Sequence, residues 1–160
     1  MNNNSLINKE IITFEAGIGK ISGVEKLYGD EDFIQVVFES LKSTSYYSMN
    51  SEGKFRFIEN KEVILKAIEI FKSAQELKVF QSVQDKINHY KSSLKNNNIC
   101  NLAKSLSELK SEEDLHAQLK VVYSKVLDSF VLEIKHTLNI RLIDAWRLIE
   151  VEKSKKLKKK

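Results

Sequence analysis

The sequence has 160 residues, 42% of them hydrophobic, and a formal net charge of +4. This hydrophobic content is enough for a folded core and excludes a wholly disordered chain. No apolar run approaches the roughly 18 residues that span a bilayer, and the first residues lack the pattern of a signal peptide. A single cysteine excludes a disulfide framework. We therefore expect a cytoplasmic protein of one or two small domains that does not associate with membranes.

The positive charge is concentrated at the C-terminus. The net charge is −2 over residues 1–58, +1 over residues 59–150 and +5 over residues 151–160. A lysine-rich terminus attracts polyanions such as nucleic acid, because binding releases condensed counterions. On the sequence alone, a solubilising tail without a specific partner is an equally good interpretation.

The first candidate motif along the chain is Gly17-Ile18-Gly19, which can begin a phosphate-binding loop or bend a β-strand. A dinucleotide-binding loop needs a third glycine three residues further on, at the start of a helix. Position 22 is Ser22, and the alternation typical of a strand continues after it. Because glycine adopts positive φ without steric cost, it suits a sharp bend or a bulge. We interpret the two glycines as a bend in a strand.

Residues 1–60 have the pattern of a small β-rich module. Short segments of strand-forming residues alternate with clusters of Gly, Asn, Asp and Ser that favour turns. This spacing predicts a small, strongly bent antiparallel sheet or barrel. The expected strands are residues 18–27, 33–38, 45–49 and 54–58.

The spacing of the apolar residues changes to a helical period near residue 60. Residues 59–77 are expected to be helical and to connect the two halves of the chain. Beyond them, four apolar stripes predict a compact bundle of about four helices. The stripes run from Phe80 to Leu94, from Ile99 to Leu109, from Leu115 to Ile134 and from Leu142 to Ile149.

Several details of these helices are expected from single residues. Asn98 is expected to cap the helix that follows it, and Asn139 to end a helix in a left-handed turn. The acidic run 112–114 fits the first turn of a helix, where the helix dipole favours negative charge. Val83, which belongs to an apolar stripe, is expected to pack in the core, and so are Leu142 and Trp146 of the last helix.

Motifs for catalysis or metal binding are not found in the sequence. His89, His116 and His136 fall in three different helical stretches without metal-ligand spacing. No P-loop, nucleophile elbow or paired-cysteine motif occurs. Cys100 lies next to an apolar stripe and is most simply a small helical residue. We therefore expect a protein that is not an enzyme and that needs neither a metal nor a cofactor.

Three segments, in the same order, resemble motifs of the CarD-type bacterial transcription regulators. Residues 17–25 look like the family's HGVGxIxxIE strand, although residues 13–16 replace the Tyr-Pro-x-His that precedes it. Residues 94–106 are similar to LKSGDxxxxAxxxxxL, with Asn98 in the place of the capping Asp. Residues 131–150 look like the closing xxEIAxALGIxxxxAxxxIE. The resemblance covers residues 10–150.

This resemblance implies an α+β regulator built from a small Tudor-like antiparallel β-barrel module and a C-terminal, compact all-helical domain. The implied division is a module at 1–60, a connecting segment at 61–78, a DNA-binding domain at 79–150 and a lysine-rich tail at 151–160. In the family, the module docks on a lobe of the RNA polymerase β subunit. The helical domain contacts double-stranded promoter DNA and stabilises the open complex. The implied protein is monomeric and located in the cytoplasm with the nucleoid.

The resemblance also implies which residues contact the polymerase. Arg56 lies where family members carry an arginine in a VRVP strand, and Phe57 and Lys26 are the accompanying candidates. An exposed arginine suits such a contact because it pairs bidentately with a carboxylate. An ordinary edge-strand arginine stays the alternative interpretation of Arg56.

The candidate DNA contacts are basic side chains that can bind phosphates of the backbone. Many family members insert a tryptophan beside a distorted base step, but Val83 occupies that place here, so a base wedge is not expected. Two alternatives stay open, namely an architectural protein that binds DNA without sequence specificity through its tail, and an adaptor for an acidic partner. The candidate residues are Lys86, His89, Lys91, Lys95, Lys155 and Lys156.

Overall fold

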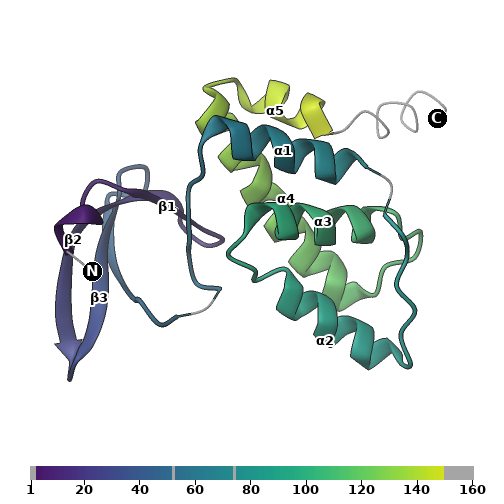
Figure 1. The fold of residues 1–160 in the computed structure, drawn as a ribbon, viewed down its shortest axis with the longest axis horizontal. Coiled ribbons are helices and arrows are strands. Elements are labelled where there is room, and N and C mark those ends of the chain that lie inside the picture. The colour runs from purple at the N-terminus through teal and green to yellow at the C-terminus, as the bar shows by residue number, and fades with distance from the viewer. Residues whose placement is uncertain (1–2, 52, 74, 150–160) are drawn as a thin grey trace. The chain divides into compact units, whose positions relative to one another are not determined.

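The computed structural model describes residues 3–51, 53–73 and 75–149. These residues form an α+β fold in which the strands precede the helices, as expected (Figure 1). The chain divides into two compact units. One comprises Met1–Ile58 with Lys95–Asn97, and the other comprises Glu59–Leu94 with Asn98–Lys160.

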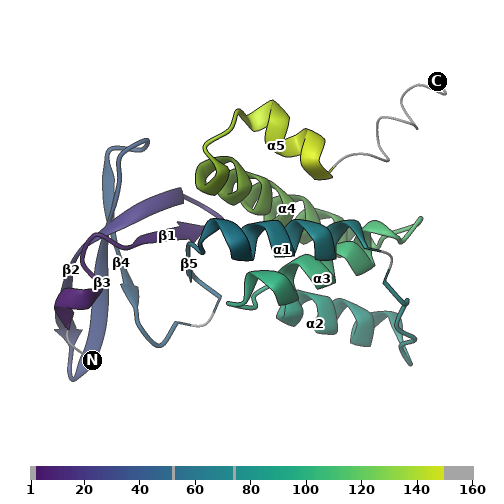
Figure 2. The same cartoon turned by 45° about the horizontal axis from the view of Figure 1, so that its top comes forward.

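The first unit contains a five-stranded antiparallel sheet in the spatial order β4-β3-β2-β1-β5 (Figure 2). The four expected strands are present with shifted ends, but the prediction lacks β1, whose last three residues are all buried and therefore do not alternate. The elements are η1 (Asn3–Ser5), β1 (Glu10–Thr13), β2 (Gly17–Tyr28), β3 (Glu31–Phe38), β4 (Ser43–Ser48) and β5 (Arg56–Phe57).

The sheet is open, which corrects the expectation of a closed barrel. β4 and β5 form its two edges, and they do not pair with each other within the described residues. The expected strong bend is present, because the register of β2 against β3 shifts at two places, between Ile21 and Gly23 and between Lys26 and Tyr28. Such bulges increase the local twist and bend the strand.

The β1–β2 hairpin explains the two glycines of the opening motif. Gly17 pairs with Thr13 at the end of the turn and has a φ of +76°, which favours glycine. A Cβ atom on Gly19 would lie 2.5 Å from Cγ1 of Val36 and 2.7 Å from the ring of Phe38. Both glycines therefore belong to a strand, as expected, but they do not mark its bend: Gly17 closes the hairpin turn, and Gly19 permits close packing of buried side chains.

The second unit consists of five helices at the expected places in the chain. α3 lies between α1 and α2, and α4 packs across them with α5 alongside (Figures 1 and 2). None of the helices in the described part of the chain has the length and hydrophobicity needed to cross a membrane. The helices are α1 (Lys61–Lys72), α2 (Val83–Ser93), α3 (Ile99–Lys110), α4 (Ala117–Leu138) and α5 (Leu142–Ile149).

Two asparagines set helix ends, as expected, Asn98 through its side chain and Asn139 through its backbone conformation. The Oδ1 atom of Asn98 accepts hydrogen bonds from the backbone N–H groups of Cys100 at 2.9 Å and Asn101 at 3.2 Å. Asn139 ends α4 with φ 52° and ψ 51°, the left-handed conformation. These two local predictions are confirmed.

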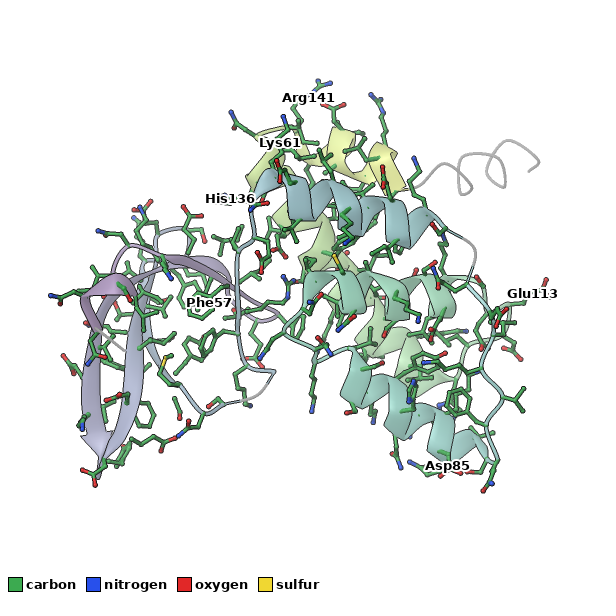
Figure 3. All side chains as sticks on the ribbon, in the orientation of Figure 1. Phe57, Lys61, Asp85, Glu113, His136 and Arg141 are labelled. Atoms are coloured by element: carbon green, nitrogen blue, oxygen red, sulfur yellow. The ribbon has the colours of Figure 1, made fainter. Side chains whose placement is uncertain are left out.

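Three other local expectations are wrong. Val83 is 62% exposed and Leu142 is 48% exposed, because each is the first residue of its helix and lies outside the buried stripe. The acidic run 112–114 lies in the connection between α3 and α4, where Figure 3 labels Glu113. α4 begins only at Ala117. The preceding residue, His116, caps this helix, because its side chain accepts a hydrogen bond from the N–H of Gln118. Trp146, in contrast, packs partly buried against the core.

The close approach at Gly19 generates a stability prediction. Gly19→Ala should lower the free energy of unfolding by about 1–3 kcal/mol, because the added methyl group overpacks the core at Val36 and Phe38. Gly23→Ala is the matched control, since its Cβ meets only the side chain of Gln35 at 3.4 Å. Urea denaturation measures both. Equal midpoints for the two variants would contradict the close approach.

Candidate protein and nucleic-acid interfaces

Arg56, the first candidate for a polymerase contact, lies on the edge strand β5 and pairs with Ile12 of β1. The residue is only 6% exposed. The expectation of an exposed arginine is therefore wrong, because a partner protein cannot form a bidentate ion pair with a guanidinium group that it does not reach.

The other two candidates lie on different parts of the sheet. Phe57, labelled in Figure 3, is half-buried, and its ring centroid lies 5.8 Å from that of Phe55 and 5.7 Å from Nζ of Lys9. Lys26 is exposed near the β2–β3 turn, whereas β5 adjoins β1, which pairs with the beginning of β2. The three candidates thus do not form one exposed surface.

β4 is one of the two edge strands of the sheet. It pairs with β3 in an unbroken register from Ser43 to Ser48, and its sequence contains neither a charged residue nor a proline. No other strand in the described ranges pairs with its outer side. Natural sheets usually protect such an edge with charges, prolines or bulges. An edge without these features can accept a strand from another chain through its backbone groups.

Lys86 and His89, two candidates for DNA contacts, are already engaged within the helical unit. Nζ of Lys86 lies 2.5 Å from Oε2 of Glu112, which links α2 to the connection after α3. The ring of His89 packs at centroid distances of 5.2 Å from Phe80 and 5.0 Å from Tyr90. The ion pair and the ring contacts reduce the positive charge and the free donor groups that these two side chains can offer to a phosphate.

The remaining DNA candidates differ in their surroundings. Nζ of Lys91 donates to Oε1 of Gln118 at 2.9 Å, which joins α2 to the start of α4. Lys95 follows α2 and is exposed. Lys155 and Lys156, with the rest of the expected tail, lie outside the described residues. Lys86 and Lys91 thus both lie on α2, and each contacts a residue of a different segment.

A cleft between the first turns of α2 and α4 adds two basic residues that the sequence analysis did not assign to DNA. Its volume is about 430 Å³, and Val83, Lys86, His116, Lys120 and Asp114 are among the residues that line it. Lys120 is exposed. The sequence gives no signal for this cleft, because α2 and α4 meet only through tertiary packing. The α2–α4 face, defined here by Lys86, Lys91, His116 and Lys120, is the candidate nucleic-acid surface.

A buried polar contact joins α2, which carries part of this face, to α3. The hydroxyl of Tyr90 donates to Oε2 of Glu108 at 3.0 Å, and Nζ of Lys78 lies 3.7 Å from Oε1 of the same carboxylate. Tyr90 is 1% exposed and Glu108 is 2% exposed. Burial, and then the hydrogen bond to Glu108, raises the pKa of Tyr90 above its ordinary range. Because a buried carboxylate is costly without partners, this contact fixes α2 against α3.

Tyr90→Phe should lower the free energy of unfolding by about 1–3 kcal/mol, since Glu108 then loses a buried donor. The raised pKa also makes stability depend on pH. Above about pH 10 the unfolded chain loses the tyrosine proton before the folded chain does. The free energy of unfolding of the wild type should therefore fall as the pH rises through this range.

Urea denaturation at about pH 8 and about pH 11 tests this expectation, with Tyr28→Phe as the control because Tyr28 is 75% exposed. Tyr90→Phe should remove part of the alkaline loss of stability, and Tyr28→Phe should not. An identical alkaline loss in both variants would contradict a buried hydrogen bond at Tyr90.

Comparison with protein families and curated proteins gives no family assignment for this chain. A scan against protein-family models finds no matching family, and a search of curated proteins finds no match. The resemblance of the three segments to CarD-type regulators therefore stays a prediction.

Proposed function

We propose that this chain is a non-enzymatic transcription regulator that links RNA polymerase to promoter DNA. Its strand unit binds the polymerase β subunit, its helical unit binds double-stranded DNA, and the two contacts together modulate the stability of the open complex. One observation supports this proposal most. The three segments that resemble CarD-type motifs each contain a residue at the start or end of a strand or helix of this chain.

The matches coincide with positions where the backbone requires particular residues. Gly17 begins β2 with positive φ, Asn98 caps α3, and Asn139 ends α4 in the left-handed conformation. The resemblance therefore includes residues that suit turns and helix caps, in addition to the spacing of apolar residues. We also propose that the bent, open sheet is a Tudor-like module, because its curvature comes from bulges in the long strand β2.

We propose β4, and not Arg56, as the docking site for the polymerase β subunit. β4 is an edge strand without charged residues, and Tyr46 at its centre is 44% exposed. A strand from the β subunit that pairs with this edge gains backbone hydrogen bonds, and neighbouring side chains supply specificity. Arg56, which is 6% exposed and lies on β5 at the opposite edge of the sheet, then has a structural role.

A charge at the β4 edge should prevent docking. Tyr46→Glu should weaken binding to an N-terminal fragment of the polymerase β subunit by at least about tenfold, since a charge on an edge strand opposes strand addition. Leu27→Glu is the matched control, because Leu27 lies on β2 of the same unit and is 41% exposed. Biolayer interferometry with the immobilised fragment measures both variants. Equal affinities for the two variants, or no binding of the wild type, would contradict docking at β4.

DNA binding is assigned to the α2–α4 face and to the C-terminal lysines. The face combines Lys91 and Lys120, whose side chains have no acidic partner within the described residues, with Lys86, which Glu112 neutralises. Asp114 also lines the cleft. Such a mixed face suits contacts to the phosphate backbone better than base readout, because phosphate contacts need only donors and positive charge.

Exchange of two lysines on this face should weaken DNA binding and its salt dependence. Lys91→Glu with Lys120→Glu should reduce the slope of log affinity against log salt by about two, since each lost phosphate contact removes about 0.9 from the slope. The control exchanges Lys66 and Lys72 of α1 for glutamate, because both are exposed and α3 separates α1 from α2 (Figures 1 and 2). Fluorescence anisotropy with a promoter duplex measures the slopes. The same slope in both double variants would contradict the α2–α4 face.

An architectural DNA-binding protein that uses only its tail is the second candidate function. The Lys86–Glu112 ion pair favours it, because this pair removes one of the few positive charges of α2 from the DNA surface. Deletion of residues 151–160 separates the two candidates. Loss of all DNA binding, with unchanged binding to the β-subunit fragment, would assign DNA contact to the tail.

A further inference from the structure

A pocket of about 460 Å³ lies beside β4 in the strand unit. Four aromatic side chains line it, namely Phe14 from the tip of the β1–β2 hairpin, Phe33 from β3, and Tyr46 and Tyr47 from β4. The bend of the sheet brings the hairpin tip to the same pocket as the edge strand. The walls therefore come from three parts of the strand unit.

Two of the aromatic walls are fixed by neighbouring rings. The centroid of Tyr47 lies 5.9 Å from that of Phe55 and 6.4 Å from that of Phe38. The ring of Phe33 meets that of Tyr28 edge to face at 5.8 Å. Phe14 and Tyr46 are 37% and 44% exposed and form the accessible side. The pocket thus presents aromatic surface that is held in place before any ligand arrives.

Two carboxylates and one lysine lie in or next to the lining of the pocket. The carboxylate residue Glu15 is among the lining residues, and the hydroxyl of Ser48, which also lines the pocket, donates to the carboxylate of Glu31. Lys54 is the one cationic residue among the lining residues in the described ranges. Residues 1–58 carry a net charge of −2. An electron-rich aromatic surface beside carboxylates attracts a cation.

We propose that this pocket binds the guanidinium group of an arginine on the polypeptide segment that pairs with β4. The proposal deepens the docking proposed above and rests on it for the source of the arginine. Arginine fits better than lysine because its planar, weakly hydrated group stacks on ring faces and pairs with a carboxylate through two donors. Glu15 is the acceptor of that pair, and the rings of Phe14 and Tyr46 cover the group.

The test uses small probes in place of the partner. The full chain is titrated with Nα-acetyl-arginine amide and, separately, with the uncharged isostere Nα-acetyl-citrulline amide, while NMR follows the aromatic resonances of Phe14 and Tyr46. The arginine probe should give saturable shifts and bind at least about threefold more tightly than the citrulline probe, as a cation–π contact with a carboxylate requires. Equal binding of the two probes, or no saturable shift, would overturn the proposal.

Matched carboxylate variants locate the site. Glu15→Gln should weaken the arginine probe about threefold or more, whereas Glu39→Gln, an equal change of charge at an exposed position of the β3–β4 turn, should leave its affinity unchanged. Equal losses in both variants would show that only overall charge matters and would overturn the site. The probes contain no polymerase, so failure of the arginine test with intact binding to the β-subunit fragment overturns the pocket proposal alone. Failure of the fragment to bind overturns the proposed docking.

Discussion

The buried apolar side chains of the strand unit and of the helical unit gather in two separate clusters. The strand cluster includes Ile11, Ile34 and Phe38, and the helical cluster includes Leu102 and Phe130. Burial of apolar surface is the main favourable term in folding, so each unit must obtain it from its own side chains. Asn60 marks the boundary, because its side chain caps α1 directly after the last strand. This separation allows one chain to offer a sheet edge to a protein and a helical face to DNA.

Inside the helical unit, polar contacts stabilise the fold at the expense of charge available to a ligand. Glu108 is buried and contacts Tyr90 and Lys78, and Glu112 pairs with Lys86. A buried or half-buried ion pair is retained because removal of either partner leaves the other without compensation. The proposed DNA surface therefore depends on lysines that the core does not use, and counting lysines on α2 overstates its available positive charge.

Local features of the fold could be predicted from the sequence, and features that depend on tertiary contacts could not. The cap at Asn98, the left-handed turn at Asn139 and the positive φ of Gly17 at the hairpin turn follow from the conformations that these residues prefer. The open sheet, the burial of Arg56 and the exposure of Val83 depend on which strands pair and where helices begin. The same holds for the candidate sites. The lysines of α2 were visible in the sequence, whereas the β4 edge, the aromatic pocket and the α2–α4 cleft require segments far apart in the chain to meet.

The central claim is that the strand unit docks on RNA polymerase through β4 while the helical unit is left for promoter DNA. Amide hydrogen exchange of the full chain, with and without RNA polymerase and in the absence of promoter DNA, tests it most directly. The account predicts slower exchange at Ser43–Ser48 when polymerase is added, because outward-facing amides of the edge strand gain hydrogen-bond acceptors. It predicts unchanged exchange in α1 to α5. Unchanged exchange at β4, or slowing confined to the helices, would contradict the account.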